Sequence, residues 1–304
     1  MDFKLIAALI LFVIFVYIMV SKIPNWVGFF VMAPLAFIMK SASADDIYGV
    51  INSSSLHLLV IIGIFSGLIG VSHLDIPIGN FIDRVTGKTT GAKKETMTLA
   101  LLFLVAAFLS WFLQNNYLTL ALLPVLFTIS KRNGTSHSKL ILFTIYATTL
   151  GGACTLIGTP TNIFASAALE EVGLEPLGFF DFAFVGVPVM ILGGIYMIAA
   201  GRFFPSYVEE LPEEYRNETT QAQLTAEDHK KMKACAVGFV AFIVCLVVES
   251  LAPFSIAPPL MGYGILVLMM LFGGFKPKEV MKCAKTDLIF QFATSMLMVK
   301  VITL

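Results

Sequence analysis

The stretch GGACTLIGTPTN, residues 151–162, interrupts an apolar run that extends over residues 140–169. The apolar part on either side is too short to cross a bilayer alone, because about 20 such residues are needed. Three glycines allow the chain to leave the helical conformation, and Thr159 before Pro160 is typical of the start of a new helix. Since lipid tolerates a broken helix only where protein buries its free backbone groups, we predict a broken transmembrane helix over 139–170.

Such a break exposes two kinds of backbone group. The start of the second half-helix presents free N–H groups and the positive end of a helix dipole, which favour an anion. Unwound carbonyl oxygens, together with amide and hydroxyl oxygens, suit a hard monovalent cation such as sodium. A capped kink without any ligand is the alternative interpretation of the same residues.

A second apolar stretch is interrupted only by Gln114, Asn115 and Asn116. The part after Asn116 has about 14 residues before Lys131, which span about 21 Å at 1.5 Å per residue. That length falls short of the hydrocarbon core, which is about 30 Å thick. We therefore predict a re-entrant helical hairpin over 96–130 that enters from the cytoplasm with the polar residues at its tip. Two ordinary spans joined outside by a turn remain the alternative.

The composition around both breaks is that of a membrane protein. Of the 304 residues, 58% are hydrophobic and 13% are charged, against about 25% charged in average soluble domains. Lys plus Arg equals Asp plus Glu, so the basic excess typical of nucleic-acid binding is absent. The four cysteines have neither metal-site nor disulfide-framework spacing. We expect an all-α polytopic membrane protein in a lipid bilayer, with no nucleic acid as partner.

The positions of the basic residues predict the orientation in the membrane. If the hairpin enters and returns on one side, that side holds all of the 20 Lys and Arg residues except Lys4, Lys40 and Lys300. Lys300 falls inside the last apolar run. We expect the basic side to face the cytoplasm and the N-terminus to lie outside, in the cell (inner) membrane.

An internal repeat is predicted from two segments of equal length. Residues 26–59 and 259–292 share the order of their elements, with DDIYGVI at 45–51 and KEVMKCA at 278–284 in matching places. An odd number of predicted spans separates the copies, so the second copy is inverted, as in many secondary transporters. A chance likeness between any two stretches of apolar helices is the alternative.

The predicted domains follow from this repeat. They are a first transmembrane repeat over 1–204, a cytoplasmic polar linker over 205–232, and the start of an inverted second repeat over 233–304. The second repeat is incomplete, because the chain stops within its third span. We therefore expect this chain to be a piece of a longer one.

AAFLSWFLQNNYLTLALLPV, residues 106–125, followed by GGACTLIGTPTN, resembles the divalent-anion:sodium symporter family. That family belongs to the ion-transporter superfamily, which also holds arsenite pumps and sodium/proton antiporters. In the family, a cytoplasmic hairpin carries a Ser-Asn-Thr tip and a broken helix carries Gly-Thr/Ser-Pro-Pro-Asn. Here the tip is Gln-Asn-Asn, and Thr161 replaces the second proline, so the substrate itself is left open.

The resemblance implies an inverted-repeat transporter fold with one ion site and one substrate site. The residues at the family's sodium site are Ser110, Gln114, Asn115 and the carbonyl of Gly158. The implied substrate contacts are Asn115, Asn116, Thr159, Thr161 and Asn162. The resemblance also implies a homodimer, with sodium as coupling ion and no other cofactor.

The predicted function is sodium-coupled symport of a small divalent anion, either a di- or tricarboxylate or sulfate. The hairpin and broken helices would move against a scaffold. A sodium/proton antiporter or an arsenite-type permease of the same superfamily is the alternative. An embedded enzyme is the other class considered, but it would need a nucleophile–base pair or a metal cluster at depth. The histidines lie at span ends or in loops, so we predict that the chain is not an enzyme.

Overall fold

The computed structural model describes residues 3–21, 23–74, 76–77, 80–81, 84, 91–133, 135–204, 225–251, 257–284 and 286–303. Over these ranges the secondary structure is helical and contains no strand. Four helical segments are long and apolar enough to cross a membrane, judged by length and composition: Ala44–Val71, Ala183–Ala200, Ala226–Val248 and Thr286–Thr303. The predicted all-α polytopic membrane fold is confirmed.

Two runs of four helices form one part of the molecule, which we call the framework. The first run is α1 (Phe3–Val20), α2 (Asn25–Ile38), α3 (Ala44–Ile51) and α4 (Ser54–Val71). The second run is α12 (Ala226–Leu251), α13 (Pro258–Gly273), α14 (Pro277–Cys283) and α15 (Thr286–Thr303). In each run the third helix is short and begins with a carboxylate at its third position, Asp46 or Glu279, that accepts a hydrogen bond from the backbone N–H of the N-cap residue.

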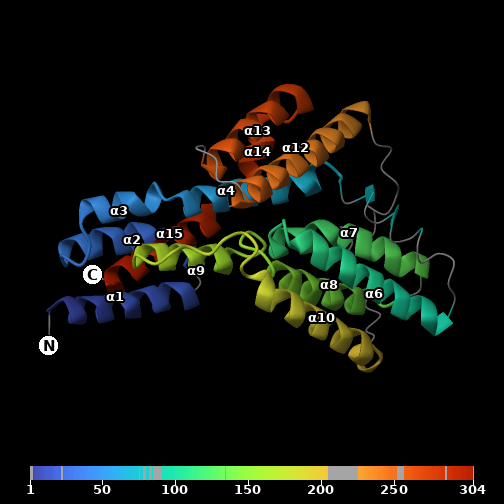
Figure 1. The fold of residues 1–304 in the computed structure, drawn as a ribbon, viewed down its shortest axis with the longest axis horizontal. Coiled ribbons are helices and arrows are strands. Elements are labelled where there is room, and N and C mark those ends of the chain that lie inside the picture. The colour runs from blue at the N-terminus through green and yellow to red at the C-terminus, as the bar shows by residue number, and fades with distance from the viewer. Residues whose placement is uncertain are drawn as a thin grey trace.

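The short third helix of each run packs against the fourth helix of the other run. The short helix α3 packs on α15, and the short helix α14 packs on α4, while α2 lies along α15 and α13 along α4 (Figure 1). At Gly67 of α4, an added Cβ would lie 2.7 Å from Cβ of Cys283, so only a glycine allows this close approach. The two runs share this order of elements, and the predicted repeat and its inversion stay predictions.

A bundle of α6 (Gly91–Ser110), α7 (Asn115–Asn133), α8 (His137–Gly152) and α10 (Ala183–Ala200) forms the other part. Gly151 lets the backbones of α8 and α6 touch, because an added Cβ would lie 2.1 Å from the carbonyl oxygen of Ala107. The short helix η1 (Gly201–Phe203) ends this part of the chain. Beyond the break that follows α8, α9 (Pro160–Glu171) leaves the bundle and packs on α4 and α15 of the framework.

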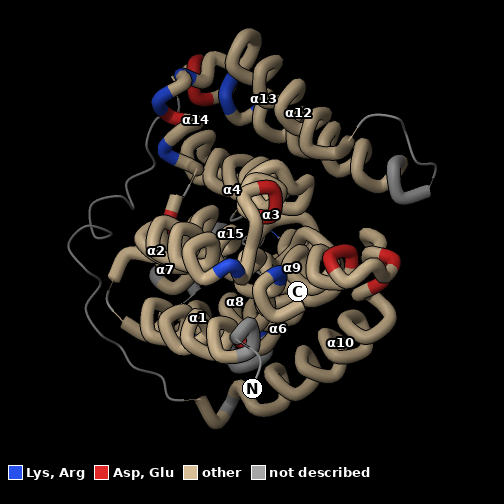
Figure 2. Tube along the Cα trace, turned by 90° about the vertical axis from the view of Figure 1, so that its left-hand side faces the viewer, with Lys and Arg blue, Asp and Glu red and all other residues tan. Residues whose placement is uncertain are grey.

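Few charged residues lie along the helices seen from the end that holds both termini. In Figure 2 the helices are almost entirely tan along their lengths, while red lies on α3 and both red and blue lie on α14 and beside α9. Exposed side chains along α10 include Phe184, Leu192 and Tyr196, at 83%, 68% and 67% exposure. Apolar side chains so exposed on a long helix suit contact with lipid.

The boundaries of two predicted elements change. The second arm of the hairpin is α7, with 19 residues instead of about 14, because the helix begins at Asn115 and continues through Lys131 to Asn133. At about 28 Å that arm nearly matches the hydrocarbon core, so its length does not decide between a hairpin and two spans. The helix α12 begins at Ala226, inside the predicted linker 205–232, and residues 205–224 lie outside the described part of the chain.

Candidate functional site

The tip of the hairpin meets the break of the broken helix inside the protein. The hairpin turns between Ser110, the last residue of α6, and Asn115, the first of α7. The backbone N–H of Asn115 donates a hydrogen bond to the carbonyl oxygen of Gly158 in the break, at 3.3 Å. Figure 1 shows these helix ends beside the start of α9, near the middle of the long axis. Two irregular segments that the sequence separates by some 40 residues thus form one cluster.

Backbone carbonyl groups converge on Gly158. A Cβ added at Gly158 would lie 2.5 Å from the carbonyl oxygen of Gly152 and 2.6 Å from that of Ser110. Both oxygens belong to the last residue of a helix, where carbonyl groups lack a partner within the helix. The carbonyl oxygen of Gly158 itself faces the hairpin tip. Glycine is therefore required at 158, and the cluster is rich in uncharged oxygen atoms of the kind that coordinate hard cations.

Thr155 fastens the break to the hairpin tip. Its buried hydroxyl donates to the carbonyl oxygen of Trp111 at the tip and accepts from the backbone N–H of Gly158 at 3.2 Å. One side chain therefore fixes both the tip and the glycine on which the carbonyl groups converge. Sequence reasoning missed Thr155, because a threonine inside an apolar break carries no spacing signal of its own.

Asn162 holds the backbone of the break from the other side. Its side-chain N–H₂ group donates to the carbonyl oxygens of Thr155 at 2.8 Å and Gly152 at 3.4 Å. These bonds give partners to backbone groups that the break would leave unpaired. The predicted substrate role of Asn162 stays a prediction, and its amide nitrogen is already committed to the backbone.

Ser110 and Gln114 are both buried at the hairpin tip. The hydroxyl of Ser110 donates to the carbonyl oxygen of Thr148 on α8 at 2.7 Å. Gln114 is 1% exposed, and among the described residues its Nε2 has no hydrogen-bond partner. A buried amide N–H₂ donor without a partner costs about 1–3 kcal/mol, so its place beside the break requires an explanation. A hydrogen-bond acceptor such as an anion would supply one.

The framework also reaches the tip, through Ser66 of α4. The hydroxyl of Ser66, which is 2% exposed, accepts a hydrogen bond from the backbone N–H of Gln114 at 3.2 Å. The hydroxyls of Thr119 of α7 and Thr148 of α8 lie 2.9 Å apart just beyond the tip. Sequence reasoning missed all three residues, since each lies in a helix where a small polar residue looks like ordinary packing.

The other predicted site residues lie at the start of α9 or at the tip. Thr159 is the N-cap residue and Pro160 the first helical residue, as predicted, but the hydroxyl of Thr159 makes no capping hydrogen bond. Thr161 is exposed in the first turn of α9. The side chain of Asn116 lies outside the described part of the structure.

The site is electrically neutral in its described side chains, which are Ser66, Ser110, Gln114, Asn115, Thr155 and Asn162. Among the described residues, no group of three or more His, Cys, Asp or Glu side chains could hold a metal ion. A cation at this cluster would therefore be held by neutral oxygens, which suits a monovalent ion. An anion would be met by the backbone N–H groups and the dipole at the start of α9.

Comparisons with known proteins place the chain among transporters. A family model described as citrate transporter matches residues 10–303. The chain is 29% identical to the uncharacterized transporter YfbS of Escherichia coli (strain K12), over 40% of this chain and 19% of that protein. It is 34% identical to an uncharacterized transporter of Methanocaldococcus jannaschii, over 38% of this chain and 26% of the relative.

A third relative is a probable sodium/sulfate cotransporter of Chlamydomonas reinhardtii. It is 33% identical over 31% of this chain and 11% of its own length. The matched part of the chain thus spans about a quarter or less of the length of these relatives.

Proposed function

The chain belongs to the citrate transporter family, and from that membership we propose that it carries a small divalent anion into the cell together with sodium. The resemblance predicted from the two breaks is confirmed, and the protein is a multi-pass membrane transporter rather than an enzyme. Citrate, a dicarboxylate such as succinate, and sulfate are the proposed substrates. The observation that carries the proposal is the hydrogen bond that joins the hairpin tip to the break at Gly158.

Sodium is proposed to bind where the carbonyl groups converge. The carbonyl oxygens of Ser110, Gly152 and Gly158 lie close together there, and the side chains of Gln114 and Asn115 lie at the adjoining tip. Neutral carbonyl and amide oxygens at a broken helix are the ligands that sodium takes in secondary transporters. Gln114 is already buried, so little side-chain entropy remains for the ion to remove.

The anion is proposed to bind beside the sodium ion, at the start of α9. Pro160 lacks an N–H group, and the N–H of Asn162 already donates to the carbonyl oxygen of Thr159 at 3.1 Å. The proposed contact is therefore the N–H of Thr161, at the positive end of the helix dipole. The hydroxyl of Thr159 forms no cap, so it can donate to a carboxylate or sulfate oxygen. Asn115 and Asn116 at the tip complete the proposed contacts.

The proposed setting is the cell (inner) membrane with the N-terminus outside, supported by the one-sided distribution of basic residues. A homodimer is proposed from the family resemblance alone. Protease accessibility of an N-terminal tag in intact cells tests the orientation, and cross-linking in native membranes tests the dimer.

Uptake into vesicles that carry the full chain tests the function. Labelled succinate, citrate and sulfate are offered with an inward sodium gradient, with potassium in place of sodium, and with a pH gradient alone. We expect at least one anion to accumulate only with the sodium gradient. Equal uptake in potassium would refute sodium coupling. Sodium movement driven by a pH gradient without any anion would favour the antiporter alternative.

A further inference from the structure

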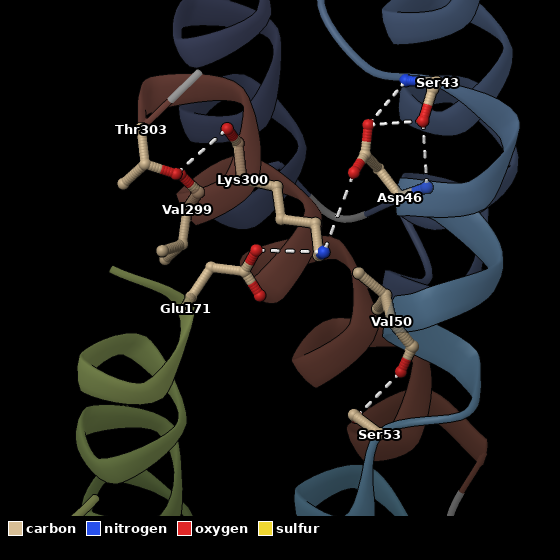
Figure 3. A network of polar contacts seen from close by, with 8 residues as sticks. All are labelled: Ser43, Asp46, Val50, Ser53, Glu171, Val299, Lys300 and Thr303. Atoms are coloured by element: carbon tan, nitrogen blue, oxygen red, sulfur yellow. Dashed lines mark hydrogen bonds and ion pairs between the residues drawn. The ribbon is translucent and has the colours of Figure 1, made fainter. Parts of the chain in front are cut away.

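Lys300 joins three helices at the end of the molecule that holds both termini. It lies in the last turn of α15, and its ammonium group is 2.9 Å from a carboxylate oxygen of Glu171 and 3.8 Å from one of Asp46 (Figure 3). The three side chains are 17%, 23% and 27% exposed. A basic residue that the sequence placed inside an apolar run is therefore a shared ion-pair partner of α9 and α3.

The stronger of the two contacts is the one to α9. At 2.9 Å the ammonium group forms a close ion pair with the carboxylate of Glu171. Asp46 is more distant and already accepts hydrogen bonds from the N–H and the hydroxyl of Ser43, at 2.8 Å and 2.6 Å. Glu171 is also the last residue of α9, where the helix dipole disfavours a negative charge. Lys300 offsets that charge.

The packing of the short helices does not require a lysine at this place. If 26–59 is aligned with 259–292 and the alignment is continued, Gly67 of α4 takes the place of Lys300 of α15. Gly67 packs directly on Cys283 of α14, so the equivalent contact in the other run is made without any side chain. The distinguishing property of Lys300 is thus its contact with α9, which the packing of α3 on α15 does not explain.

We propose that Lys300 is a positioning residue for the ion and anion site at the opposite end of α9. This inference rests on the proposed function and adds a residue to it. The helix has 12 residues, so Lys300 acts about 18 Å from the break. Phe164 of α9 packs edge-to-face on Phe292 of α15, with 5.9 Å between ring centres, and the ion pair fixes the end beyond it.

A short helix moves as one body, so releasing its far end lets its first turn tilt. That turn is separated from Gly158 only by the N-cap residue Thr159, and it contains Asn162, whose side chain donates hydrogen bonds to carbonyl groups of the break. Loss of the Glu171–Lys300 pair therefore loosens the ligand geometry without removing any ligand. Loss of the pair should therefore lower the affinity for sodium and anion and leave the maximal transport rate nearly unchanged.

Transport kinetics in vesicles test this positioning role through four variants. Lys300→Gln and Glu171→Gln should each raise the KM for sodium about fivefold or more, the lower end of coupling between distant sites, with a nearly unchanged maximal rate. The double variant should be no worse than either single one, because both remove the same pair. Lys300→Arg should restore the wild-type KM. Glu170→Gln, an exposed neighbour on the same helix, is the matched control and should have no effect.

Cysteine cross-linking provides a readout that needs no transport. Cysteines replace Phe164 and Phe292 in a background without the four native cysteines, and copper phenanthroline drives disulfide formation. Lys300→Gln should slow the cross-link, and Lys300→Arg should not. Wild-type KM values in both Lys300→Gln and Glu171→Gln, or an unchanged cross-linking rate, would overturn the proposal. If the wild type shows no sodium-dependent uptake, the proposed function fails, while the cross-linking still decides whether Lys300 anchors α9.

Discussion

Replacing Gly158 by alanine adds one carbon atom at the point where the hairpin tip and the break meet. The new Cβ would lie 2.5 Å from the carbonyl oxygen of Gly152 and 2.6 Å from that of Ser110. These are backbone atoms, which cannot rotate away as a side chain does. Each must withdraw by roughly 0.8–0.9 Å to reach ordinary contact, a strain that typically costs about 1–3 kcal/mol.

That displacement exceeds what an ion site tolerates, since ligand distances at metal sites hold to within about 0.2 Å. If the strain falls on sodium binding, 1–3 kcal/mol corresponds to a loss of affinity of about 5–150-fold. The assay is anion uptake into vesicles at varied sodium concentration, with thermal unfolding in detergent measured on the same preparation. We expect the sodium KM of Gly158→Ala to rise by at least fivefold, while the protein still inserts and unfolds cooperatively.

Gly70→Ala is the matched control for this change. Gly70 lies in α4, and an added Cβ there meets no atom within 4 Å. The same chemical change should leave transport unaltered and raise helix stability by up to about 1 kcal/mol. A Gly158→Ala protein that keeps the wild-type sodium KM would refute the assignment of the ion site to this cluster.

Three other changes probe the same construction and its surroundings. Gly151→Ala should reduce the amount of folded protein in the membrane, measured by fluorescence-detected size exclusion, because its Cβ would overlap the backbone of α6 at 2.1 Å. Thr155→Val should raise the sodium KM while Thr155→Ser, which keeps the hydroxyl, should not; equal KM values would remove Thr155 from the site. The backbone N–H of Lys276 and the ammonium of Lys231 lower the pKa of Glu279 from its ordinary value of 4.5, so the folded state favours the ionised form. Its contribution to stability is complete above pH 4.5 and is lost as the pH falls through the lowered pKa. The difference in Tm between wild type and Glu279→Gln should therefore shrink on acidification below 4.5, and a constant difference would contradict this.

The two breaks could be predicted from the sequence because their signals are local. Gly151, Gly152 and Gly158 sit within one short segment, and Pro160 after Thr159 marks a helix start that the structure reproduces. Apolar runs interrupted in this way leave few alternatives in a bilayer. The family resemblance rested on the same short segments, and it is confirmed by a match over residues 10–303.

The contacts that build the site could not be predicted, because they arise from tertiary structure. Ser66 meets Gln114 across 48 positions of sequence, and nothing in an apolar helix marks which small residue will face a partner. The length of α7 was underestimated for a related reason. A charged residue such as Lys131 ends an apolar run, but it does not end a helix, since lysine and arginine are good helix formers.

Lys300 shows how composition alone misleads. A lysine within an apolar run is expected to destabilise the protein in the bilayer, because a charged side chain in hydrocarbon is unfavourable. In the fold it lies between two carboxylates from other helices. The carboxylates that pair with Lys300 come from α9 and α3, and the sequence alone does not show that these helices lie beside it.

A neutral site gives a physical reason for coupling the two ions. A dianion moved alone into a membrane site without charged side chains would lose much of its hydration energy, and the dipole of one short helix returns little of it. A sodium ion about 4 Å away, at an effective dielectric constant near 20, attracts each unit of negative charge by about 4 kcal/mol. Such an attraction raises the affinity for each ion when the other is bound, and the gain is the same in both directions. The neutral oxygens that converge on Gly158 would therefore serve the anion as well, because a sodium ion bound there, as we propose, would supply the positive charge that the site lacks.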